Sequence, residues 1–228
     1  MKFYQKLDGA VHVSAREYDI AGGTAISEGQ LVKLSEGFVV PAAADETEAI
    51  LGIAAENHSG VADAIDPRAD GKKIFVIDDP CVVMQCKAPE VTATAGSETT
   101  LQADGLNIFS NGDFNGGYVK LIRKAEKSED ADALEQAQSK NTDVIGQVRR
   151  ITDFTDGTLT LEKGGAPEVG DVYALFPPIG FAKGNLSADG ASLVLTKTAE
   201  LPVMVMGRDL GLGKINLIAK KHLFAANA

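Results

Sequence analysis

Short runs in which apolar and polar residues alternate, separated by glycine, proline and aspartate, make up most of the chain. They are clearest in residues 144–176, where we predict a meander of three consecutive strands at 147–154, 158–162 and 172–176. In the middle run Leu159 and Leu161 alternate with polar residues, so one face of that strand should be buried. Thr155-Asp156-Gly157 should join the first two strands as a hairpin, because glycine adopts positive φ without steric cost.

The first half of the chain contains more predicted strands of the same kind. Residues 49–55 (AILGIAA) are continuously apolar, which indicates a strand buried on both faces. Two turns, Ser35-Glu36-Gly37 and Asp78-Asp79-Pro80, should each join two strands as a hairpin. The strands predicted here are 30–34, 38–41, 49–55, 73–77 and 82–87.

The second half continues this pattern around one helical stretch. In GYVKLIR (117–123), Val119 and Leu121 share a face that should be buried. Ser128, followed by acidic residues, predicts a short surface helix within 124–143, because the helix dipole favours anions in the first turn. Further strands are predicted at 180–186, 192–196, 202–206 and 214–219.

About a dozen short strands without a β-α-β rhythm predict an all-β fold, with small barrel-like or sandwich-like regions, short hairpins and one minor surface helix. The N-terminal segment should be an arm that either packs on its own domain or reaches a neighbouring subunit. The predicted segments are the arm (1–28), a first β region (29–95), a connection and strand (96–123), an acidic helical insertion (124–143) and a second β region with a loose C-terminal tail (144–228).

Composition narrows the kinds of partner that the protein can bind. Apolar residues make up 44% of the 228 residues, so a packed core is expected. The formal net charge of −10 argues against a nucleic-acid surface and against an anionic membrane. The N-terminus lacks the apolar stretch of a secretory signal, and no run approaches the roughly 20 apolar residues of a spanning helix. We therefore expect a soluble protein that is made in the cytoplasm.

The cysteines and histidines do not indicate a disulfide or a metal site. Cys81 and Cys86 are predicted to be small buried residues on opposite faces of a strand, and so not a disulfide. His12, His58 and His222 have no partner at zinc-ligand spacing, and His58 is expected in a solvated loop. The glycine-rich stretch 207–213 precedes a β-rich segment, whereas a phosphate loop would precede a helix.

Three acidic clusters and one arginine pair are the remaining candidates for a binding site. None of the clusters matches an EF-hand loop, and a turn, a helix cap or solubility explains each of them better than calcium binding. Arg149 and Arg150 should point to opposite faces of a strand, with one solvated and one paired locally. We therefore predict no catalytic, cofactor-binding or metal-binding residues, and no enzyme activity. The acidic clusters are Asp63/Asp66/Asp70, Asp78-Asp79 and Glu129/Asp130/Asp132.

Two stretches together resemble a known family. They are residues 29–57 (GQLVKLSEGFVVPAAADETEAILGIAAEN) followed by 72–86 (KKIFVIDDPCVVMQC), and residues 145–178, which are punctuated by glycine and aspartate. This order of strands and turns is similar to that of the capsid decoration, or cement, proteins of tailed bacteriophages. The resemblance covers about two-thirds of the chain and includes no catalytic residue.

The resemblance implies a virion structural protein that binds the outer surface of the assembled capsid and stabilises it. The expected partners are the major capsid protein lattice and further copies of the chain, with a homotrimer as the favoured oligomer. The expected location is the capsid surface, after assembly in the host bacterial cytoplasm. The alternatives are another phage part (tail, baseplate or head fibre), a carbohydrate-binding module, or a hydrolase that uses His58 and Asp63.

Overall fold

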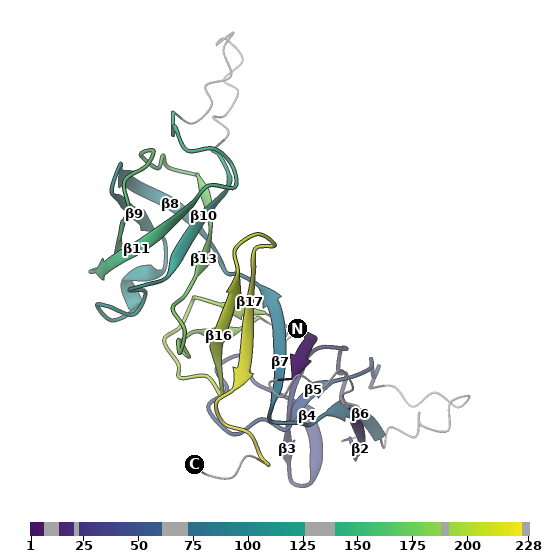
Figure 1. The fold of residues 1–228 in the computed structure, drawn as a ribbon. Coiled ribbons are helices and arrows are strands. Elements are labelled where there is room, and N and C mark those ends of the chain that lie inside the picture. The colour runs from purple at the N-terminus through teal and green to yellow at the C-terminus, as the bar shows by residue number, and fades with distance from the viewer. Residues whose placement is uncertain (7–13, 21–22, 61–72, 126–139, 188–191, 225–228) are drawn as a thin grey trace. The chain divides into compact units, whose positions relative to one another are not determined.

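The computed structural model describes residues 1–6, 14–20, 23–60, 73–125, 140–187 and 192–224 (Figure 1). It confirms the all-β prediction, since the described residues form short strands and a single 3-10 turn, η1 (Leu106–Ile108). The chain folds into two compact units. Unit 1 comprises Met1–Lys87, Ala182–Gly207 and Asn216–Ala228, and unit 2 comprises Ala88–Phe181 and Arg208–Ile215.

A four-stranded sheet, most of which belongs to unit 1, explains why these units differ from the predicted segments. Its order is β1 (Lys2–Lys6), β7 (Val82–Lys87), β17 (Lys214–Ala219) and β16 (Val203–Asp209). The C-terminal strands thus return to β7, so residues 144–228 do not form one region. The predicted arm contributes β1 here and β2 (Ala15–Asp19) to a second sheet, so in the described residues it pairs with its own chain.

The second sheet of unit 1 has five strands and is nearly closed. Its order is β2, β6 (Lys73–Ile77), β5 (Gly52–Ala54), β3 (Leu31–Ser35) and β4 (Phe38–Pro41). A parallel bridge between Ile20 and Val39 connects the two outer strands. The burial predicted for residues 49–55 is confirmed for Ile50 to Ala54, but the strand itself is shorter than predicted and comprises only Gly52–Ala54. The core of this sheet consists of Ile20, Ile26, Val32, Val39, Leu51, Ala54, Ile74 and Val76.

Unit 2 is organised around a closed six-stranded barrel. As predicted, Val119 and Leu121 are fully buried and point into it. A group of phenylalanine rings packs near the end of β11, where Phe114 meets Phe154 edge-on with ring centroids 4.9 Å apart. In order around the barrel the strands are β10 (Tyr118–Arg123), β11 (Val148–Thr155), β12 (Thr158–Leu161), β9 (Thr100–Ala103), β8 (Glu90–Ser97) and β13 (Val172–Phe176).

Two tight turns agree with the prediction, while two predicted strand pairings are wrong. Glu36-Gly37 and Asp156-Gly157 both have positive φ at both residues, which is the geometry of the hairpins that they close. The predicted meander is wrong, because β12 pairs with β9, and β13 pairs with β10 and β8. The predicted hairpin around Asp78-Asp79-Pro80 is also wrong, because β6 pairs with β2 and β5, whereas β7 pairs with β1 and β17.

Three smaller predictions concern the connections. Strand β9 lies in the connection predicted at 96–123, and β8 lies at the end of the first β region, where no strand was predicted. The pair β14 (Asn185–Leu186) and β15 (Leu193–Val194) is shorter than predicted, and the turn between them lies outside the described residues. The helix predicted within 124–143 falls mostly on residues 126–139, which also lie outside them.

Candidate functional site

One end of the unit 2 barrel is filled by polar rather than apolar side chains. Arg149 lies opposite Val119 in the β10–β11 register, so it points into the barrel, and only 3% of it is exposed. We use the name buried polar cluster for this residue and the four that surround it. Its members are Asn141, Asp143, Arg149, Asp171 and Tyr173, and none is more than 3% exposed.

The guanidinium group of Arg149 donates to three carbonyl oxygens, which belong to the β8–β9 turn and the β12–β13 connection. Its Nε donates to the carbonyl oxygen of Glu162 at 2.8 Å and its Nη1 to that of Gly165 at 2.9 Å. Its Nη2 donates to the carbonyl oxygen of Glu98. Nη1 also lies 3.5 Å from Asp143 Oδ2. The neighbouring Arg150 is exposed, so the prediction of one locally paired and one solvated arginine is confirmed.

Asp171 and Asn141 form the other half of the cluster. Asn141 Nδ2 donates to Asp171 Oδ2 and to the Tyr173 hydroxyl, at 2.8 Å in both cases. Asp171 Oδ1 accepts the backbone N–H of Ala125 at 2.9 Å. Burial is the main reason that the pKa of Tyr173 lies above its usual value. The cluster therefore fixes the chain on either side of residues 126–139 to the start of β13.

The buried polar cluster has a structural role. Among the described residues, no buried side-chain atom of the cluster lacks a hydrogen-bond partner. A catalytic group must keep a proton, a lone pair or an open position for its substrate. Here the donors and acceptors are engaged with one another, as in networks that fix one packing arrangement.

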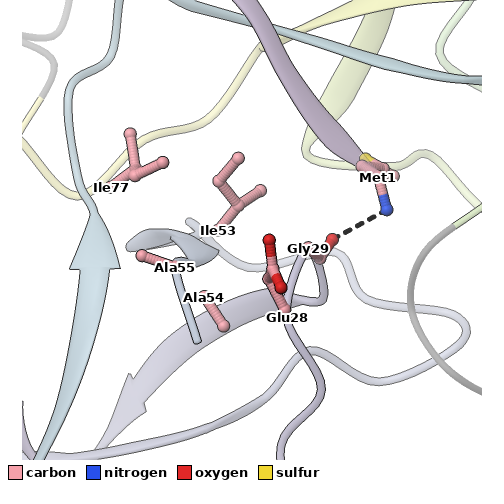
Figure 2. A pocket seen from close by; sticks show the side chains of 7 residues that line it. All are labelled: Met1, Glu28, Gly29, Ile53, Ala54, Ala55 and Ile77. Carbon is pink, nitrogen blue, oxygen red and sulfur yellow. Dashed lines mark hydrogen bonds between the residues drawn. The ribbon is translucent and has the colours of Figure 1, made fainter. Parts of the chain in front are cut away.

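Unit 1 contains a groove of about 410 Å³ beside β5 (Figure 2). The amino group of Met1 donates to the carbonyl oxygen of Gly29 at 2.8 Å. Figure 2 shows the Glu28 carboxylate between Ile53 and Gly29. The groove thus combines an apolar floor with one carboxylate at its side. Its described lining residues are Met1, Glu28, Gly29, Ile53, Ala54, Ala55 and Ile77.

His222 lies in a second, much smaller cavity of unit 1. Its Nδ1 accepts the backbone N–H of Phe224 at 3.1 Å, and its Nε2 is buried without a partner. The cavity measures about 10 Å³, which leaves no room for a ligand larger than water. The tail was predicted to be loose, but within its described residues Leu223 N–H donates to the carbonyl oxygen of Ile50 at 2.9 Å.

Unit 1 is expected to lose stability in mild acid through His222. Burial lowers the pKa of His222 below its ordinary value of 6.5, although Asp78 and Asp79 act in the opposite direction. Unfolded chains therefore bind a proton at pH values where the folded chain does not. This contribution to stability is intact above about pH 6.5 and is lost as the pH falls toward the folded-state pKa.

The matched variant for this test is His222→Asn, which keeps an acceptor near the position of Nδ1 and does not titrate. Chemical denaturation at pH 7.5 and 5.5 should show a smaller loss of unfolding free energy in the variant than in the wild type. Equal losses in both proteins would show that another group is responsible.

The remaining candidate residues are structural where the structure describes them. His58 lies half-buried, with Nδ1 3.2 Å from the carbonyl oxygen of Thr24 and 3.1 Å from the backbone N of Gly60. Cys86 is buried as predicted, and burial raises the pKa of its thiol. Cys81 is exposed, so its predicted burial is wrong, because it lies in the turn before β7.

Asp78 was predicted only as a turn residue, but it is buried and bonded. It accepts the hydroxyl of Tyr18 and lies 3.4 Å from Arg16 Nη1. Burial, together with this hydrogen bond, raises the pKa of Tyr18 to about 12. The candidates that fall outside the described residues are His12, Asp63, Asp66, Asp70, Glu129, Asp130 and Asp132.

The described residues contain no group of three or more histidine, cysteine, aspartate or glutamate residues placed to hold a metal ion. None of their helices is long and apolar enough to span a membrane.

Comparisons with known proteins add no relative. No protein-family model matches the chain, and no curated protein or solved structure matches it. The class is therefore defined by the fold: an all-β protein of two compact units, one of which contains a closed six-stranded barrel.

Proposed function

We propose that this protein is a virion structural protein that binds the outer surface of an assembled phage capsid and stabilises it without catalysis. Its partner is the major capsid protein lattice, and its location is the capsid surface, which it reaches after synthesis in the host bacterial cytoplasm. The observation that supports this proposal most strongly is the strand β16, which is the last strand of its sheet among the described residues.

Strand β16 has the properties of an edge that another chain can extend. Its seven residues, VMVMGRD, contain no proline that would remove a backbone donor. Val203 and Val205 anchor it in the core at 1% exposure each, while Met204 and Met206 are half-buried. An unpaired edge of this length is a template for strand addition, in which main-chain hydrogen bonds supply the affinity.

The strength of such pairing suits a lattice better than an isolated complex. Each main-chain hydrogen bond adds only about 1 kcal/mol net, so a few of them give weak binding. A capsid presents the same site many times, and oligomeric copies then bind with an avidity above that of one contact. A structural role therefore fits an edge that binds weakly on its own.

The test uses empty capsids of the phage that encodes the protein, heated with and without it. We expect the protein to sediment with the capsids and to raise their rupture temperature. The double variant Met204→Lys/Met206→Lys should bind at least about tenfold more weakly, because lysines on an edge strand oppose pairing.

Phe38→Lys is the matched control, since it places a lysine on an exposed apolar residue of unit 1 far from β16 in sequence. It should bind like the wild type. Capsids whose rupture temperature is unchanged by the wild-type protein would overturn the proposal.

A further inference from the structure

The outer side of β10 and β11 in unit 2 forms a surface of mixed cationic and apolar character. In the strand register Tyr118 lies opposite Arg150, and Lys120 lies opposite Val148. Opposed residues project to the same face of a sheet. Since Val119 on β10 points into the barrel, these four side chains project outward.

Residues 208–212, which belong to unit 2, pack against this outer side. Lys120 Nζ donates to the carbonyl oxygens of Leu210 and Gly211, at 2.8 Å in both cases. The Arg208 guanidinium lies 4.9 Å from the centre of the Tyr118 ring, and its Nη1 donates to Gly116 O at 2.9 Å. We use the name cationic face for Tyr118, Lys120, Val148, Arg150, Arg208 and Leu212.

The cationic face combines exposed apolar side chains with basic side chains that are held in place. Leu212, which follows Gly211 in the chain, is 68% exposed and Val148 36%, so this part of the surface also offers apolar area. The hydrogen bonds of Lys120 and the ring contact of Arg208 hold both side chains in place, which reduces the entropy lost on binding. Tyrosine and arginine are also the residue types that contribute most often to binding hot spots.

The basic side chains of this face form no ion pair within the described residues. Lys120 and Arg208 bond to neutral carbonyl oxygens, and no described carboxylate forms an ion pair with either of them or with Arg150. Within residues 208–212, the Asp209 carboxylate accepts the backbone N–H of Leu212 at 2.9 Å. The chain as a whole carries a net charge of −10, so a second copy offers the opposite charge.

A complementary acidic surface lies at one end of the same barrel. Asp156 is exposed in the β11–β12 turn, and Asp104 is exposed directly after β9. The pairing of Gln102 with Thr158 places these two acids at the same end of the barrel. Lys120 and Val148 lie toward the start of β11, which is the opposite end of that strand.

We propose that the cationic face is the self-association surface of this protein and docks on the Asp104/Asp156 end of a second copy. Because the two surfaces are different, the contact is head-to-tail, and such contacts close into rings when the rotation allows. A closed ring of three copies would be the homotrimer that the family resemblance implies. The inference deepens the proposed function, on which its biological use rests.

Sedimentation velocity of the full-length protein at 1–100 μM tests this surface directly. We expect a concentration-dependent oligomer that weakens as salt rises from about 50 to 500 mM, because salt screens exposed charges. Arg150→Glu and Leu212→Ser should each raise the dissociation constant at least tenfold. Val169→Ser, which changes an exposed valine elsewhere on unit 2, should leave it within twofold.

Charge exchange provides the specific test of the partner surface. Asp156→Arg alone should weaken association, and Arg150→Glu with Asp156→Arg in one chain should recover at least part of it. A wild-type protein that stays monomeric at 100 μM, or an Arg150→Glu variant that associates normally, would overturn the inference. Binding to capsids is measured separately, so a monomer that still sediments with capsids would refute this surface and leave the proposed function standing.

Discussion

Replacing Arg149 with alanine is expected to lower the unfolding free energy of unit 2 by about 3–5 kcal/mol, the usual result of removing one partner from a buried ion pair. The substitution leaves the Asp143 carboxylate buried without its cation. It also removes the donors to the carbonyl oxygens of Glu162, Gly165 and Glu98. Hydrogen exchange of the β10–β13 amides measures the effect, because it reports on unit 2 by itself.

The adjacent arginine is the matched control for this prediction. Arg150→Ala removes the same side chain from an exposed position, so the change should stay within about 0.5 kcal/mol. Arg149→Lys should fall between the two, since an ammonium group cannot reproduce the planar fork that reaches three carbonyl oxygens. Equal protection in the two alanine variants would contradict the role assigned to the buried polar cluster.

The sequence predicted individual strands far better than it predicted their partners. Residues 172–176 and 82–87 were predicted with the bounds that the structure shows, because alternation and flanking turns are local signals. Their pairing depends on segments far away in the chain: β13 joins β10 and β8, and β7 joins β1 and β17. The assumption that successive strands pair in order therefore failed at both places.

In the buried polar cluster, too, local patterns predicted the orientation of side chains but not their distant partners. The opposite orientations of Arg149 and Arg150 follow from the strand period, and they were predicted correctly. Asn141 and Asp171 are 30 residues apart, so no local pattern brings them together. Gly165 was the one residue that could have indicated the cluster. A Cβ atom at this position would lie 2.2 Å from Asn141 Oδ1, so only glycine fits beside the cluster. The sequence showed this glycine only as a break between strands.

The burial of His222 was not predicted, for a different reason. It lies between lysines and small residues near the end of the chain, where ends are usually loose. The parallel bridge to Ile50 orders this segment, and a single bridge has no periodic signature in the sequence. Burial of His222 is therefore a tertiary effect that only the structure shows.

Replacing Gly52 with alanine is expected to destabilise unit 1 by about 3 kcal/mol or more, which is the upper range for overpacking a core. An alanine Cβ at this position would lie 2.0 Å from the carbonyl oxygen of Ile77 and 3.1 Å from the Cα of Asp78. Both contacts are with backbone, which cannot rotate away as a side chain can. Strand β5 is also paired on both sides, with β3 and β6, so it cannot move without breaking one ladder.

Gly207→Ala separates this steric effect from the general cost of changing a strand glycine. Gly207 also lies in a strand, β16, but the nearest atom to its added Cβ would be Asn216 Nδ2 at 3.4 Å, an ordinary contact. Neither glycine has a positive φ, so backbone strain does not distinguish them. The Gly207 variant should change stability by less than about 1 kcal/mol and can stabilise by restricting the unfolded chain. Hydrogen exchange of the amides in β3, β5 and β6 compares the two variants. If these amides are equally protected in both, the close approach of β5 to the end of β6 does not restrict the side chain at residue 52.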